Sequence, residues 1–95
     1  MTDPGSPDRD FSALGQEADP RARARLAIQQ VISWYGRELM QQRRSETPDP
    51  DRTAALQKGL ERAQEDQRGL PQAEADEVQR LTDTYVALYR QLTES

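Results

Sequence analysis

The chain has 95 residues, which is enough for one small domain but not for a catalytic domain with a regulatory one. It contains no His and no Cys, so disulfides, thiolate or imidazole metal sites and the usual general base are excluded together. Apolar residues make up 34% and charged residues 32% of the chain, with a net charge of −4, a composition near the boundary between globular and disordered proteins. We therefore expect a small folded core and no metal or cofactor.

Residues 1–18 are rich in Pro, Gly, Ser and Asp and are predicted to form a disordered acidic tail. Its large apolar residues are Phe11 and Leu14, which either dock on the folded part or remain free; the sequence leaves both possibilities open. The segment lacks the apolar core of a secretory signal. The predicted three-helix domain occupies residues 19–95.

The first helix is predicted over residues 20–44. Asp19 can cap its N-terminus, and Pro20 suits the first helical position because the amide there needs no partner. One face carries an apolar stripe, widened on one flank by Ala27 and Trp34. Gly36 in the interior suggests a close helix crossing, although a tolerated substitution explains it almost as well. The stripe comprises Ala24, Ile28, Val31, Ile32, Tyr35 and Leu39.

The second helix is predicted over residues 50–68, with Asp49 as the cap and Pro50 at the first position. Its apolar face is thin, consisting of Leu56, Leu60 and Ala63 with Gln67 continuing it. Gly69 is expected to end this helix as a left-handed cap, with Leu70 folding back as its hydrophobic partner.

The third helix is predicted over residues 71–93, and short connections between the helices favour an all-α, up-down-up three-helix bundle with a long first helix. Tyr35 and Leu39 are expected to be core residues facing the third helix. So few apolar residues make the isolated monomer marginal, which favours self-association or a protein partner. The apolar stripe of the third helix comprises Val78, Leu81, Tyr85, Leu88, Tyr89 and Leu92.

Charge is unevenly distributed along the chain. Residues 20–44 hold six Arg against the single acid Glu38, whereas residues 1–19 carry a net charge of −4 and residues 45–95 a net charge of −5. An overall acidic chain with an acid at two helix N-termini does not favour nucleic-acid binding. No apolar run approaches the ~20 residues that span a bilayer. We expect a cytoplasmic protein that binds neither nucleic acid nor membrane.

Two short resemblances to known families bear on function. Trp34-Tyr35-Gly36 resembles the Trp-x-Gly signature of small secreted helical hairpins, which implies a turn between two helices; core packing within the first helix is the alternative interpretation. The helical layout, with Asp49-Pro50-Asp51-Arg52 opening the second helix, resembles the small all-α chorismate mutases. That resemblance implies an enzyme with a basic site for a dianionic substrate, in which Arg52 is the residue that carries over.

The first helix also has a distinctive face opposite its apolar stripe, which we call the back face. At 100° per residue, seven positions fall within about 100° of arc on that side. Arg and Met are enriched in protein interfaces, and Arg can bind carboxylates in bidentate geometry. The sequence therefore predicts a non-enzymatic protein-interaction module, with a solvated face or a chorismate mutase-like enzyme as alternatives. The back-face residues are Arg23, Leu26, Gln30, Ser33, Arg37, Met40 and Arg44.

Overall fold

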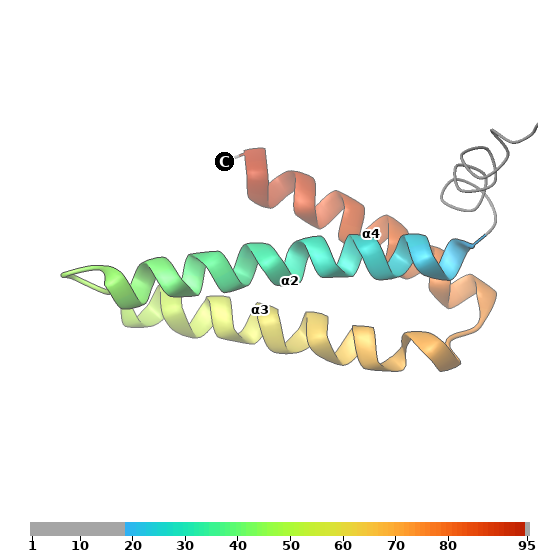
Figure 1. Ribbon diagram of the computed structural model, residues 1–95, viewed down its shortest axis with the longest axis horizontal. Coiled ribbons are helices and arrows are strands. Elements are labelled where there is room, and N and C mark those ends of the chain that lie inside the picture. Colours follow the sequence, from blue (N-terminus) through green and yellow to red (C-terminus); the bar gives the residue numbers. More distant parts are fainter. Residues whose placement is uncertain (1–18, 95) are drawn as a thin grey trace, which may run out of the picture.

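The computed structural model describes residues 19–94 and shows an all-α fold in which three helices run up, down and up (Figure 1). This confirms the predicted fold class. The predictions made for residues 1–18, including Phe11 and Leu14, lie outside the described residues. The elements are α2 (Pro20–Arg44), α3 (Pro50–Gly69), the 3₁₀ turn η2 (Leu70–Gln72) and α4 (Ala75–Glu94).

Both Asp-Pro pairs begin a helix in the way the sequence predicts. The Asp19 carboxylate accepts hydrogen bonds from the backbone N–H groups of Arg21 and Ala22, at 3.1 and 3.2 Å. The Asp49 carboxylate accepts equivalent bonds from Asp51 and Arg52, at 3.0 and 3.2 Å. Each carboxylate satisfies amide groups that lack a partner inside the helix, and its charge lies near the positive end of the helix dipole.

The connection between α3 and α4 differs from the prediction. Gly69 has a right-handed backbone, with φ −82° and ψ −11°, so the predicted left-handed cap is wrong. The chain instead continues through η2, and α4 begins at Ala75 rather than at residue 71. Leu70 is only 1% exposed, but it is buried as the first residue of η2 and not as the partner of a left-handed cap.

An arginine from the start of α2 holds this connection in place. Arg21 Nε donates to the backbone oxygen of Leu70 at 3.2 Å, and its Nη2 donates to the backbone oxygen of Ala73. The Leu70 oxygen also accepts from the backbone N–H of Ala73 at 3.1 Å, so Arg21 adds a second donor there and a side-chain donor to the Ala73 oxygen, where the helical hydrogen-bond pattern is interrupted. The first turn of α2 is thereby fixed to the junction of the other two helices.

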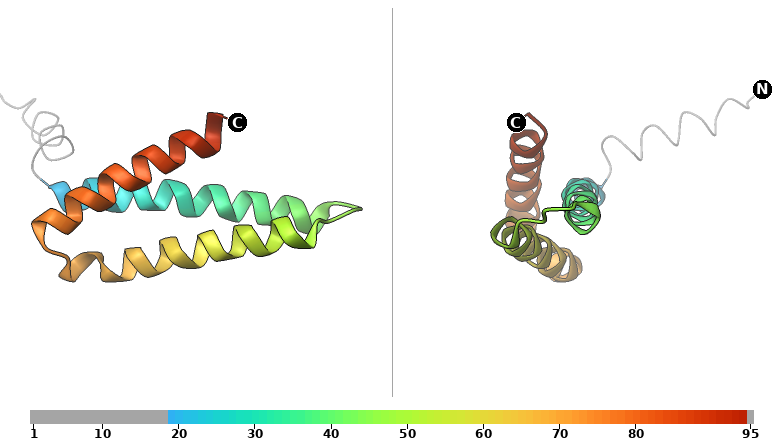
Figure 2. Two further views of the ribbon diagram at one scale, coloured as in Figure 1. Left: turned by 180° about the vertical axis from the view of Figure 1, so that it is seen from behind. Right: turned by 90° about the vertical axis from the view of Figure 1, so that its left-hand side faces the viewer.

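The core lies at the end of the molecule where this junction is found. Helix α2 packs against both α3 and α4, whereas direct contact between α3 and α4 is sparse. Figure 2 shows α3 running alongside α2 while α4 crosses it obliquely and diverges toward the C-terminus. The buried cluster comprises Ala24, Ala27, Ile28, Val31, Ala63, Leu70, Val78, Leu81 and Tyr85.

Burial along α4 follows this divergence. Val78, Leu81 and Tyr85 are 3–4% exposed. The later members of the same stripe, Leu88, Tyr89 and Leu92, are only partly buried. The stripe is continuous in sequence, but the surface that covers it is not.

Two side chains of α2 that were expected to face the third helix also lie against α3 or its connection to α2. The ring of Tyr35 lies against Gly59 of α3, and Leu39 shares a hollow with Pro48, Thr53 and Gln57 at the α2–α3 end. Both are half-buried. Leu39 therefore lies toward α3 rather than toward the third helix. Tyr35 contacts α3 but also packs against the buried cluster to which α4 contributes Val78, Leu81 and Tyr85, so it lies between the two helices.

The helix crossing uses a different glycine from the one the sequence suggested. A Cβ atom built at Gly36 would meet nothing within 4 Å, whereas one built at Gly59 would lie 2.4 Å from Cζ of Tyr35. Gly59 thus makes room for the tyrosine ring, whereas no close contact requires a glycine at the position of Gly36.

These two glycines form a matched pair for mutation. We expect Gly36→Ala to raise the free energy of unfolding by about 0.5–1 kcal/mol, because Ala is the better helix former and the added methyl group meets nothing. Gly59→Ala should raise the free energy of unfolding by less than Gly36→Ala does, or should lower it, because the Tyr35 ring must move. Thermal unfolding of both variants checks this. In a Tyr35→Ala background the two substitutions should become equivalent, and a persistent difference would contradict the assignment.

Candidate interaction surface

The back face of α2 is exposed along its whole length. Helices α3 and α4 cover the opposite side, where Ala24, Ile28 and Val31 are fully buried. Every residue that the sequence assigned to the back face is placed on that free side. All of them are exposed: Arg23, Leu26, Gln30, Ser33, Arg37, Met40 and Arg44.

Two of these residues are large apolar side chains with little cover. Leu26 is 58% exposed and Met40 is 49% exposed. In the part of the chain that the structure describes, the other large hydrophobic residue with comparable exposure is Val86 of α4, at 45%. Single exposed apolar residues are normal in soluble proteins, so it is their position among arginines on one helix face that distinguishes Leu26 and Met40.

The back-face arginines have no acidic partner within residues 19–94. Elsewhere, Arg52 pairs with Glu38 at 3.0 Å, Arg62 lies 3.7 Å from Asp66, and Arg80 pairs with Glu77. No ion pair or side-chain hydrogen bond joins Arg23, Arg37 or Arg44 to another described residue. Their guanidinium groups are therefore available to carboxylates from outside the folded domain.

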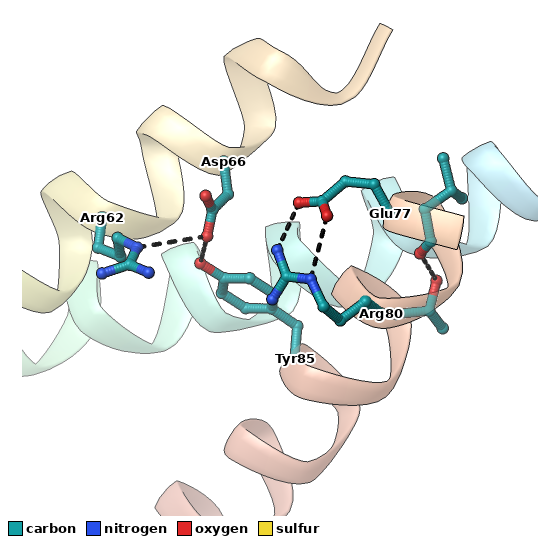
Figure 3. A network of polar contacts seen from close by, with 7 residues as sticks. Arg62, Asp66, Glu77, Arg80 and Tyr85 are labelled. Carbon is teal, nitrogen blue, oxygen red and sulfur yellow. Dashed lines mark hydrogen bonds and ion pairs between the residues drawn. The ribbon is translucent and has the colours of Figure 1, made fainter. Parts of the chain in front are cut away.

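A second polar constellation, which the sequence did not reveal, joins α3 to α4. Figure 3 shows the Tyr85 hydroxyl donating a hydrogen bond to Oδ2 of Asp66, and Arg62 contacting the same oxygen. The bond from Tyr85 is 2.5 Å long. Tyr85 belonged to the predicted core stripe, but its partner Asp66 carried no signal. The two residues are 19 apart in sequence, so only the packing of α4 reveals the pair.

The environment of Tyr85 favours its neutral form. Burial raises the pKa of its hydroxyl well above the ordinary value of 10.0, and the hydrogen bond to Asp66 adds to this effect. A phenolate next to the Asp66 carboxylate would be destabilised by like charge. The constellation thus acts as an interhelical hydrogen bond from a neutral phenol to a carboxylate.

The two family resemblances receive no support from the geometry. Arg52, the residue carried over from the chorismate mutases, is paired with Glu38, so its charge is already engaged. The hollow nearest to it, about 280 Å³, is lined by Leu39, Gln42, Arg43, Pro48, Thr53 and Gln57. Trp34 and Tyr35 lie within α2 rather than in a turn, with ring centroids 5.4 Å apart in an edge-to-face arrangement.

Among residues 19–94, no group of three or more carboxylates is placed to hold a metal ion. No helix in that range is both long enough and apolar enough to cross a bilayer. The cytoplasmic location stays a prediction.

Comparison of the chain with protein-family models, with curated proteins and with solved structures found no match.

The Tyr85–Asp66 bond gives a prediction for alkaline pH. Because the pKa of Tyr85 is higher in the folded protein than in the unfolded chain, its contribution to stability is complete below pH 10 and is lost as the pH rises above that value. Tyr85→Phe should lower the free energy of unfolding by about 1 kcal/mol at neutral pH. It should also weaken the fall in stability above pH 10, as measured by urea unfolding at several pH values.

Tyr89→Phe is the control for this experiment. It lies on the same helix, and its hydroxyl makes no hydrogen bond to another residue within 19–94. An equal loss of stability in both variants at neutral pH would show that the Asp66 bond contributes nothing.

Proposed function

We propose that the protein is a non-enzymatic interaction module that binds an acidic surface of a protein partner through the back face of α2. The observation that carries this proposal is the coincidence, on one uncovered helix face, of two exposed apolar side chains and three arginines without an acidic partner in the described domain. Neither feature alone would point to an interface, because scattered charge and isolated apolar residues are common on protein surfaces.

The spacing of these residues suits a helical or extended partner lying along α2. Leu26 and Met40 are 14 positions apart, which is two heptads and about 21 Å along the helix axis. Arg23, Gln30, Arg37 and Arg44 follow one another at seven-residue intervals on the same face. A partner with carboxylates flanking an apolar seam would match both the apolar anchors and the charges.

A different protein fits this face better than a second copy of the same face. Pairing two back faces would bring arginines of like charge together, which opposes association. Self-association would instead require the back face of one copy to bind an acidic region of another, such as the surface formed within residues 45–95, which carry a net charge of −5.

The direct test removes the two apolar anchors. Leu26→Ser and Met40→Ser together should cost little stability, because both side chains are exposed, but should abolish partner capture from the native host. The matched control is Val86→Ser, which removes an equally exposed apolar side chain from α4. We expect quantitative mass spectrometry to find a partner that is lost with the double variant and retained with Val86→Ser. Identical capture by all three proteins would mean that the back face is merely solvated.

Charge reversal provides an independent prediction. Arg37→Glu should weaken binding to the partner identified above, because Arg37 lies on the back face between the two apolar anchors. The difference from the parent protein should shrink with added salt, since exposed charges are screened over about 10 Å at 0.1 M ionic strength. Light scattering of the purified protein over the same salt range would show whether any mass change accompanies this effect. Salt-independent weakening would contradict an electrostatic role.

A further inference from the structure

We infer that the N-terminal acidic segment of the chain binds back onto the first half of the α2 back face, around Arg23, Leu26 and Gln30, where it competes with the external partner. Only the competition with an external partner rests on the proposed function. The contact itself follows from charge, chain length and the side on which α2 begins, and it can be tested without any partner.

Charge complementarity is the first argument. Residues 1–18 contain four acids, Asp3, Asp8, Asp10 and Glu17, against the single base Arg9. The surface that they would meet carries Arg23, which is exposed and has no acidic partner within residues 19–94. The segment also contains Phe11 and Leu14, and Leu26, which is 58% exposed, offers them an apolar contact.

The path of the chain is the second argument. Asp19, the N-cap of α2, precedes Arg23, Leu26 and Gln30 in the 4-3-4 spacing of one helix face, so α2 begins on the side of its back face. Leu26 lies about 10 Å along the helix axis from Asp19. The five residues from Leu14 to Asp19 span up to about 17 Å when extended, so Leu14 can reach Leu26 after the chain reverses, and Asp10 can reach further along the face.

Because the segment is covalently attached to α2, even a weak contact is enough for it to occupy the back face for much of the time. A short tether presents the segment to the back face at an effective concentration in the millimolar range. An external partner must then displace the segment, and its apparent affinity equals its intrinsic affinity multiplied by the fraction of molecules whose face is free. If the segment covers the face three-quarters of the time, deleting residues 1–17 should raise partner affinity about fourfold.

The test uses a spin label, because the chain contains no Cys and Ser12→Cys therefore creates a single attachment site. In the full-length protein, we expect the label to attenuate the amide signals of Arg23, Leu26 and Gln30 more strongly than those of Val86 on α4. Added salt should reduce this attenuation. In the matched variant Phe11→Ser with Leu14→Ser, carrying the same label, it should fall to the lower level that an undocked segment attached at Asp19 gives at the start of α2.

Several results would overturn the inference. Equal attenuation of the back-face signals in the parent protein and in the matched variant would show no docking. Attenuation centred on the partly buried α4 residues Leu88, Tyr89 and Leu92 would place the segment on a different surface. Mixing labelled chains with isotope-enriched, unlabelled chains identifies contacts between copies, and attenuation found there would assign the occupant to a second molecule. None of these results bears on the Leu26 and Met40 capture experiment, so the two proposals fail separately.

Discussion

The structure depends on α2 packing against both other helices. Helices α3 and α4 make little direct contact with one another, so neither has a substantial apolar partner without α2. The α2 contact surface begins with Ala24 and Ala27, and α3 contributes Ala63. These small side chains allow close approach of the helix backbones, but each buries little area. Larger residues such as Ile28, Val31 and Leu70 therefore provide most of the hydrophobic stabilisation.

The same constraint accounts for the free back face. Two helices packed on one side of a third cover only part of its circumference, and the opposite side has no neighbour in the described domain. At one end of α2, Arg21 is held by the carbonyl groups of Leu70 and Ala73. Two residues further on, Arg23 lies on the free side. Two arginines only two positions apart in one helix thus have different roles. Arg21 stabilises the fold and Arg23 remains available for binding, because their side chains project in different directions.

Features encoded by neighbouring residues could be predicted from the sequence. Asp19 and Asp49 cap helices through hydrogen bonds to amides two and three positions away, so both helix N-termini could be predicted. The exposure of the back face followed from helical periodicity alone. The predicted cap of α3 was wrong because Gly69 continues into the turn at Leu70 with a right-handed backbone, although Gly often adopts the left-handed form at such positions.

Features that depend on pairs of helices could not be predicted in the same way. Nothing local distinguishes Gly36 from Gly59, yet only Gly59 lies against an aromatic ring. The partners of Tyr35 and Leu39 depended on where α4 leaves α2, which is a property of the crossing angle. The Asp66–Tyr85 bond likewise requires knowledge of how the helices are arranged. Single-chain periodicity identifies which face is buried but not what buries it.

The unequal burial of α4 has a consequence for its local stability. Its first half is fixed by Val78, Leu81 and Tyr85, whereas Leu88, Tyr89 and Leu92 are only partly covered. Opening the last turns exposes little new apolar surface and leaves the hydrogen bond to Asp66 intact. The backbone amides of the C-terminal half should therefore exchange with solvent deuterium through local fraying, while those around Leu81 should exchange only when the whole domain opens. Protection would rise stepwise from Glu94 toward Tyr85 along a single helix.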